Sequence, residues 1–340
     1  MAVKVMNQVE RTKLRQQLPA LQFNRALDFE QCSDSLREYF QRYHFDQLVD
    51  ETHCNYHVGR AQLAGYECVA HTWFPDRFGH SDTVVITHGL FDHAGLYLHL
   101  VRRLLLQHYT VVLVDFPGHG LSEGRPASIG DFSEYAAVLA ATMMLLKRSE
   151  RFAEVSLIGQ STGASAILYF VMDQAYDHNI KCISLLAPLV RPRNWPLVRV
   201  SYTLAKYFVK DVPRKFTVNS HHQEFCDFLK NEDPLQVRRI PLLWIRAMIT
   251  WVDYFQTQTR LLGEHKINQR SIPVLIIQGA TDDTVDWKYN LEVIKKHFKY
   301  PSQVIVNDMA HHIVNEAPER REFAFTALLK FLEQKVVSLA

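Results

Sequence analysis

Several features that would mark a specialised class of protein are absent from this chain of 340 residues. It has only five cysteines, which are widely scattered and form no C-x-x-C pair. A disulfide framework is therefore not expected, and a reducing compartment fits the chain better. The 38 basic and 36 acidic residues leave a formal net charge of only +2, so the composition gives no indication of nucleic-acid binding.

Long hydrophobic runs are missing as well. The longest, Tyr135–Leu146, is far shorter than the roughly 20 residues needed to span a bilayer. The first ten residues contain no hydrophobic region of a signal peptide. We therefore expect a cytoplasmic location, with attachment to the inner face of a membrane as the alternative.

Motifs for cofactors and metals are also lacking. The chain has no G-x-x-x-x-G-K-[ST] phosphate-binding loop, and Gly118-x-Gly120 lacks the rest of a dinucleotide fingerprint. His53 and His57 have the i, i+4 spacing of metal ligands on a helix, but β-forming residues surround them. We expect neither a cofactor nor a bound metal.

What the chain does contain, from about residue 56, is an alternation of strand-like and helix-like segments. Several of the strand-like runs are continuously apolar, which is typical of strands buried on both faces of a parallel sheet. The alternation predicts an α/β fold with a mostly parallel, doubly wound sheet. The predicted strands are His57–Leu63, Tyr66–Trp73, Thr83–Thr87, Thr110–Asp115, Glu154–Ile158, Cys182–Leu186, Pro273–Gln278 and Gln303–Val306. The predicted helices between the later strands include Leu96–Gln107, Phe132–Lys147, Ala164–Gln174 and Lys288–His297.

The composition divides the chain into three parts. Residues 1–55 are predicted to form an N-terminal helical extension, and residues 56–190 and 272–340 the α/β core. Residues 191–271 are aromatic and helical in character, and they are far more numerous than a crossover between two strands needs. We therefore expect them to form a cap inserted into the core. An irregular amphipathic stripe in the extension consists of Leu36, Tyr39, Phe40, Tyr43 and Phe45.

A nucleophile is indicated by Gly159-x-Ser161-x-Gly163. A β-rich run precedes this motif and a helical run follows it, as in a sharp strand-to-helix turn that exposes a serine hydroxyl at its apex. Glycines are needed on both sides because a side chain there would collide with neighbouring backbone. The pattern predicts that Ser161 is a nucleophile rather than an ordinary turn serine.

A serine nucleophile needs a base within hydrogen-bond reach and a third group that orients the base. In this architecture the acid and then the histidine should follow later strands. Two positions in the chain are ambiguous, because Asp282 has Asp283 beside it, with Asp286 as a weaker candidate, and His311 has His312 beside it. We favour Asp282 and His311.

The oxyanion that forms during acyl transfer requires two backbone N–H groups. One should belong to the residue after the nucleophile, Thr162, and the other to Leu90, which follows a predicted strand and the turn His88-Gly89. We expect His88 and His93 to have packing or supporting roles, and Asp115 to belong to the scaffold.

Taken in this order, Gly159–Gly163, His88-Gly89, Pro117–Gly120, Gly279-x-x-Asp282 and His311 make the chain resemble the α/β-hydrolase superfamily. More narrowly it resembles the lysophospholipase and monoacylglycerol lipase group, which is classified beside the serine aminopeptidases. The resemblance covers roughly residues 60–335, including Asn231–Leu235 in the cap. It implies an acid three residues after a strand glycine, as at Asp282. It also implies a histidine followed five residues later by a glutamate, as at His311 and Glu316.

The cap provides the evidence on substrate. Trp244, Met248, Trp251 and Phe255 form one stripe of a helix, which either docks the cap on the core or lines an acyl pocket. We expect Trp244, Met248 and Trp251 to bind substrate.

Residues 191–215 carry seven basic residues and one acidic residue. An apolar stripe of Val198, Tyr202, Ala205 and Val209 runs beside Arg199, Lys206 and Lys210. Such a segment forms either a solvated face of the cap or a peripheral contact with an anionic membrane.

These features predict a hydrolase of carboxylic esters with a lipid-like small-molecule substrate, such as a lysophospholipid or a monoacylglycerol. The alternatives are an aminopeptidase or thioesterase with the same triad, and a non-catalytic lipid-binding or partner-binding protein. Dehalogenase and epoxide hydrolase chemistry is disfavoured, because relatives of that kind have an aspartate in place of the serine.

Overall fold

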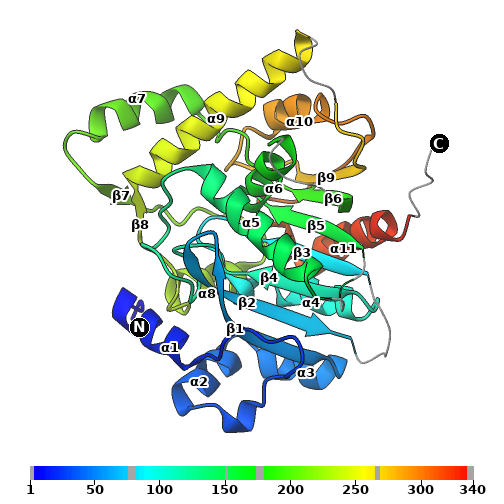
Figure 1. Ribbon diagram of the computed structural model, residues 1–340. Coiled ribbons are helices and arrows are strands. Elements are labelled where there is room, and N and C mark those ends of the chain that lie inside the picture. The colour runs from blue at the N-terminus through cyan, green and yellow to red at the C-terminus, as the bar shows by residue number, and fades with distance from the viewer. Residues whose placement is uncertain are drawn as a thin grey trace.

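The computed structural model describes residues 4–75, 82–149, 152, 154–173, 180–264 and 269–334. Its centre is an eight-stranded sheet in the order β1-β2-β4-β3-β5-β6-β9-β10 (Figure 1). The β1–β2 and β2–β4 pairs are antiparallel and the other pairs are parallel. The strands of this sheet are β1 (Asn55–Leu63), β2 (Tyr66–Phe74), β3 (Thr83–Thr87), β4 (Thr110–Val114), β5 (Val155–Gln160), β6 (Ile180–Leu186), β9 (Val274–Gly279) and β10 (Pro301–Val306). The predicted α/β class is confirmed, and each predicted strand is found within a few residues of its expected ends.

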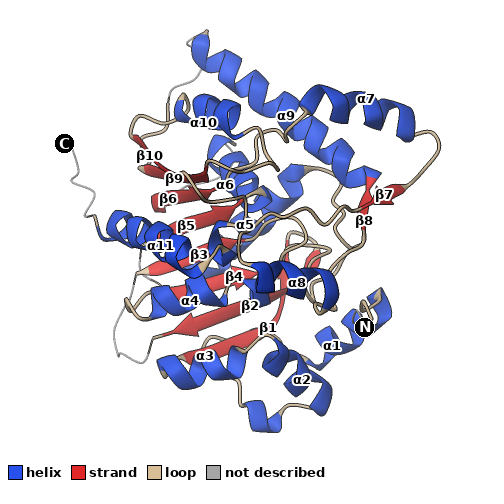
Figure 2. Cartoon of the chain, turned by 180° about the vertical axis from the view of Figure 1, so that it is seen from behind, coloured by secondary structure: helices blue, strands red, loops and turns tan. Residues whose placement is uncertain are grey.

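Helices cover both faces of the sheet. On one face lie α5 (Phe132–Lys147), α6 (Thr162–Met172) and α10 (Trp287–Lys295), which stand in front of the strands in Figure 1. On the other face lie α4 (Leu98–Leu105) and α11 (Pro318–Glu333), which are in front when the molecule is seen from behind in Figure 2. The predicted end of one helix at Gln174 lies outside the described residues.

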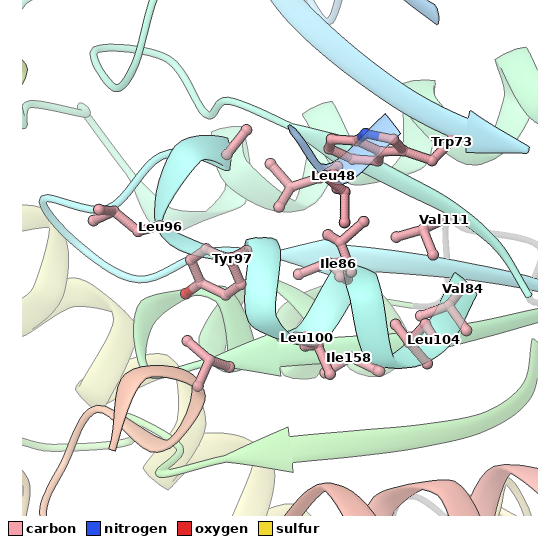
Figure 3. Packing of buried hydrophobic residues seen from close by; sticks show 14 of the residues in the cluster. Leu48, Trp73, Val84, Ile86, Leu96, Tyr97, Leu100, Leu104, Val111 and Ile158 are labelled. Atoms are coloured by element: carbon pink, nitrogen blue, oxygen red, sulfur yellow. The ribbon is translucent and has the colours of Figure 1, made fainter. Parts of the chain in front are cut away.

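The alternation of side chains along each strand produces two separate cores. Val84 and Ile86 of β3 pack on the face covered by α4, whereas Val85 between them packs on the face covered by α5 and α6. Figure 3 shows the first of these cores, in which Leu100 and Leu104 of α4 lie against Ile86 and its neighbours. Continuous apolar runs are required because both sides of each strand are buried.

The N-terminal extension contains α1 (Gln8–Gln17), α2 (Asp34–Arg42) and α3 (Phe45–Thr52). It packs beside the β1–β2 hairpin, where the Phe45 ring stacks on Tyr56 and His71 with centroid distances of 5.6 and 5.3 Å. All five residues of the amphipathic stripe predicted in this extension are buried. The extension is therefore joined to the core of the molecule.

The cap segment, residues 191–271, lies between β6 and β9. It contains α7 (Trp195–Ala205), α8 (Gln223–Asn231), α9 (Leu242–Gly263) and an antiparallel ribbon of β7 (Asp211–Pro213) and β8 (Arg239–Pro241). In both overall views α7 lies at the edge of the molecule, alongside α9 (Figures 1 and 2). Within the described parts of the chain, no helix has the length and apolarity that crossing a membrane requires.

Candidate active site

Ser161 sits in a strained turn between β5 and α6. Its backbone has φ 53° and ψ −112°, an unusual conformation for a residue with a side chain. The turn is closely packed, because a Cβ atom on Gly163 would lie 2.1 Å from the carbonyl oxygen of Thr87. This geometry places the serine hydroxyl at the carboxyl end of the sheet, and it explains why glycine is needed at position 163.

The structure brings the three predicted triad residues into contact. His311, in the loop after β10, has its Nε2 atom 2.9 Å from the Ser161 Oγ atom. Its Nδ1 atom lies 2.8 Å from the Oδ2 atom of Asp282, in the loop after β9. A carboxylate only accepts hydrogen bonds, so Nδ1 carries the proton and donates it, and Nε2 is left to accept from the serine hydroxyl.

Electrostatics in this site favour an ionised acid beside the imidazole. Burial alone would raise the pKa of Asp282, but the charge of His311 and hydrogen bonds, including one from the Gln278 amide, lower that pKa below its ordinary value. Burial alone would lower the pKa of His311, but the charge of Asp282 and their hydrogen bond raise it. The arrangement suits a base that becomes cationic during a reaction.

The neighbouring candidates have other partners. The carboxylate of Asp283 is exposed and forms an ion pair with Arg193. Asp286 pairs with Arg191 at 2.6 Å. The ring of His312 points elsewhere, with its Nε2 atom 3.2 Å from Asp92. Geometry therefore selects Asp282 and His311 from the adjacent pairs.

Glu316 holds the loop that carries His311. Its buried carboxylate accepts hydrogen bonds from the backbone N–H groups of Ala310 and Ala317, each at 2.8 Å. It also accepts from the backbone and the ring of His221 in the cap segment. The five-residue spacing from His311 to Glu316 thus reflects a carboxylate that fixes the turn just before the histidine.

The two predicted oxyanion donors face the same cavity as Ser161. Leu90 and Thr162 both line it. Thr162 begins α6, so its N–H is among the helix-initial amides without an intrahelical acceptor. Within the described residues the N–H of Leu90 has no acceptor either. The preceding amide, that of Gly89, is instead held by Asp92 and Tyr97.

His88 and Asp115 are used within the scaffold. The Nε2 atom of His88 accepts a hydrogen bond from the backbone of Phe116 at 2.8 Å. Asp115 accepts from the backbone N–H groups of Ala94 and Leu121. Neither residue is among those that line the cavity.

The cavity has a volume of about 450 Å³ and is lined largely by apolar side chains of the core and the cap segment. Trp244 and Met248 are among the lining residues, whereas Trp251 is not, and binding of substrate by these side chains stays a prediction. The Trp251 indole packs on Phe255 at a centroid distance of 5.3 Å and donates to the carbonyl of Leu189. The stripe on α9 therefore lines the cavity only in its first turns and docks the helix on the core beyond them.

A family model described as serine aminopeptidase, S33 matches residues 79–318, which is more than half of the chain. The chain belongs to this family. The match begins after the β1–β2 hairpin, so the helical extension lies outside it.

Relatives of this S33 family member include lipases and esterases. The monoacylglycerol lipase of Mycolicibacterium smegmatis is 26% identical over 73% of this chain and 92% of that protein. Human monoglyceride lipase is 22% identical over 75% of this chain and 83% of its own length. A pimeloyl-[acyl-carrier protein] methyl ester esterase of Xanthomonas campestris is 31% identical, but the chain spans only 44% of its length.

Solved structures support the same fold. A soluble variant of the Saccharomyces cerevisiae monoglyceride lipase has a TM-score of 0.68 at 17% identity, covering 81% of this chain and 93% of that one. The monoacylglycerol lipase of Paleococcus ferrophilus has a TM-score of 0.62 at 19% identity, covering 78% of this chain and 98% of that one. At such low identity the likeness establishes the α/β-hydrolase fold alone.

Two groups near the site of this family member were not found from sequence. One is Asp92, which is buried between His312 and Tyr97. The other is Arg214, which lies between β7 and α8 and lines the cavity. The only signal for Arg214 in the sequence was its place in a basic segment, where most members are exposed.

Proposed function

We propose that this protein is a serine hydrolase of carboxylic esters with lipid-like substrates, a lysophospholipid or a monoacylglycerol. The observation that carries the proposal is the continuous contact of Ser161, His311 and Asp282 at the floor of a largely apolar cavity. A chain of alcohol, imidazole and carboxylate is what nucleophilic acyl transfer requires. The apolar lining suits an acyl chain.

The proposed reaction has two halves. Ser161 Oγ attacks the ester carbonyl while His311 Nε2 takes its proton, and Asp282 stabilises the imidazolium that results. The N–H groups of Leu90 and Thr162 stabilise the oxyanion, a contribution of on the order of 3 kcal/mol for each donor. His311 then protonates the departing alcohol. Water next attacks the carbonyl of the acyl-enzyme while His311 takes its proton, and His311 gives that proton to Ser161 Oγ as the bond to serine breaks and the fatty acid leaves.

Residues 191–271 would act in this reaction as a cap over the acyl chain. They supply Trp244, Met248 and much of the rest of the cavity wall. An aminopeptidase or thioesterase could use the same triad. The apolar lining favours the ester of a fatty acid over an aminoacyl amide.

Two measurements test the proposal. Hydrolysis of p-nitrophenyl esters of increasing chain length, beside aminoacyl amides, should favour the longer esters. Ser161→Ala should abolish both hydrolysis and labelling by a fluorophosphonate probe, whereas Ser165→Ala, which removes a hydroxyl one turn along α6, should leave the nucleophile labelled. Undiminished turnover by Ser161→Ala would refute the assignment, and a wild-type protein that the probe does not label would favour the non-catalytic alternative.

We further propose that α7 and the turn after it contact an anionic membrane. Most of the predicted stripe is not free surface, because Val198, Tyr202 and Ala205 are partly buried and Val198 lines the cavity. Its fourth member, Val209, is exposed together with other apolar side chains. Leu204 is 64% and Phe208 84% exposed, beside Lys206 and Lys210. Such a surface suits the boundary between lipid headgroups and acyl chains. The exposed apolar set is Leu197, Val200, Leu204, Tyr207, Phe208 and Val209.

A further inference from the structure

The catalytic cavity contains a cation that the triad does not use. Arg214 lines the cavity, and its guanidinium stacks on the rings of Phe91 and Phe216, with the Cζ atom 3.9 and 4.3 Å from the two centroids. Phe91 directly follows Leu90, the proposed oxyanion donor. The guanidinium is therefore held next to the turn where an ester carbonyl would react.

The hydrogen bonds of Arg214 leave one edge of the guanidinium free. Its Nη1 atom donates to the side-chain oxygen of Gln236 at 2.6 Å and to the carbonyl of Val237 at 3.3 Å. Both acceptors are neutral. Within the described part of the chain, Nε and Nη2 have no acceptor, and no carboxylate lies within 4 Å of the guanidinium. The Nε and Nη2 edge is the one that binds two oxygens of an oxyanion side by side.

The surrounding charges do not neutralise this cation. Asp92 also lines the cavity, but its carboxylate already accepts from His312, Tyr97 and the amide of Gly89. The exposed carboxylate of Asp227, another lining residue, accepts a hydrogen bond from the side-chain amide of Gln223. Lys215 and Lys230 add positive charge to the lining. A further cation, Arg238, also contacts the Phe216 ring, with its Cζ atom 4.8 Å from the ring centroid.

Arg214 remains charged in this setting. Burial lowers its pKa to about 10, against the opposing effect of Asp92 and Asp233. A pKa of about 10 keeps the group protonated at neutral pH. A partly desolvated cation without a carboxylate partner gains most from an anionic ligand.

We propose that Arg214 forms an anion subsite of the catalytic cavity, which binds the phosphate oxygens of a monoacylated glycerophosphate substrate. The inference rests on the proposed esterase function and narrows it. Among the substrates considered above, it favours the phosphate-bearing lysophospholipid over the neutral monoacylglycerol. With the acyl chain along Trp244 and Met248, the phosphate side of the substrate would lie toward Phe91.

The test uses short-chain esters that stay monomeric in solution, so that binding to a lipid surface does not contribute. The full-length protein is assayed on 1-hexanoylglycerol, 1-hexanoylglycerol 3-phosphate and the phosphodiester 1-hexanoyl-glycerophosphoglycerol. We expect the wild-type protein to prefer a phosphate ester. Arg214→Gln should lower kcat/KM on that ester on the order of ten- to hundredfold, mainly through KM, because a charged pair of hydrogen bonds is lost. The assay also compares the phosphomonoester with the phosphodiester. The one whose kcat/KM falls more in Arg214→Gln has the kind of head group that the subsite binds.

Controls separate this role from a structural one. The loss caused by Arg214→Gln should be much smaller on 1-hexanoylglycerol than on the phosphate ester, and Arg214→Lys should restore part of the preference for phosphate. Arg239→Gln, which changes an exposed cap arginine paired with Asp211, should keep that preference. An equal loss on neutral and phosphate esters, or a wild-type protein without preference for phosphate, would overturn the inference. If the proposed esterase function itself were wrong, the result would be distinguishable, because no ester would be hydrolysed and the fluorophosphonate probe would not label Ser161.

Discussion

Asp282 and Asp283 are adjacent in the chain, yet their carboxylates have opposite surroundings. Asp282 is buried and accepts hydrogen bonds from the His311 ring, the Gln278 amide and the backbone N–H of Thr284. Asp283 points outward to Arg193. The difference in role that we predict therefore corresponds to a difference in orientation, which makes the two residues a matched pair for mutation.

Asp282→Asn should lower kcat by about 10⁴-fold, because an asparagine cannot hold the imidazole in the required tautomer or stabilise its cation. The pH profile should change as well. In the wild-type protein, activity should fall as pH decreases through the raised pKa of His311, because a protonated imidazole cannot accept the serine proton. Without the charge of Asp282, burial lowers that pKa, so the acidic limb of kcat/KM should move to lower pH.

The matched variant is Asp283→Asn, which removes an exposed carboxylate from the next position. It should retain the rate and the acidic limb of the wild-type protein. A pH–rate series on a soluble p-nitrophenyl ester measures both variants. If Asp283→Asn lost activity and Asp282→Asn kept it, the choice of acid would be wrong.

At the residue scale, the sequence predicts features that depend on local spacing along the chain. It does not predict features that depend on how distant side chains are oriented in the fold. The serine turn follows from local backbone geometry, so the motif around Ser161 was sufficient to predict it. The position of Trp251 beyond the cavity could not be predicted, because helical periodicity gives the face on which a residue lies and not how far along the helix the cavity extends. Arg214 could not be found, because its site forms only when it meets Phe91, which is distant in the chain.

At the scale of secondary structure, the helical extension is coupled to the cap segment by hydrogen bonds to residues 233–235, among them the buried carboxylate of Asp233. The Tyr43 hydroxyl, after α2, donates to Asp233 at 2.6 Å, and the backbone N–H of Met6 donates to Pro234. Asp233 also accepts from His93 and from Gln236, which in turn holds Arg214. These contacts lower the pKa of Asp233 to about 2 in spite of burial. The sequence predicted an amphipathic extension but gave no indication of this partner.

Tyr43→Phe should destabilise the protein by about 2 kcal/mol, because a buried carboxylate loses a charge-assisted hydrogen bond. Tyr39→Phe is the control from the same helical region. Its hydroxyl is buried without a partner among the described residues, so its removal should be neutral or slightly stabilising. Urea unfolding of both variants measures the difference, and equal stabilities would show that the Tyr43 contact contributes nothing.

For the molecule as a whole, the cap segment connects the wall of the cavity to the outer surface. Val198 of α7 and the exposed Val218 both line the cavity, so its wall adjoins the apolar set exposed on α7. Phe323 is also exposed, at 57%, and its helix, α11, lies away from α7 on another side of the molecule (Figures 1 and 2). Phe323 therefore provides a control, since its substitution removes an exposed aromatic side chain outside this apolar set.

The double variant Leu204→Ser, Phe208→Ser should weaken binding to vesicles of phosphatidylglycerol and phosphatidylcholine by at least about 100-fold, since each buried apolar side chain contributes roughly 1.5–3 kcal/mol. Its hydrolysis of a soluble short-chain ester should be unchanged, because neither residue lines the cavity. Phe323→Ser should bind vesicles like the wild-type protein. Vesicle sedimentation measures all three, and equal binding by the double variant would mean that the exposed face of α7 is not the surface that meets the membrane.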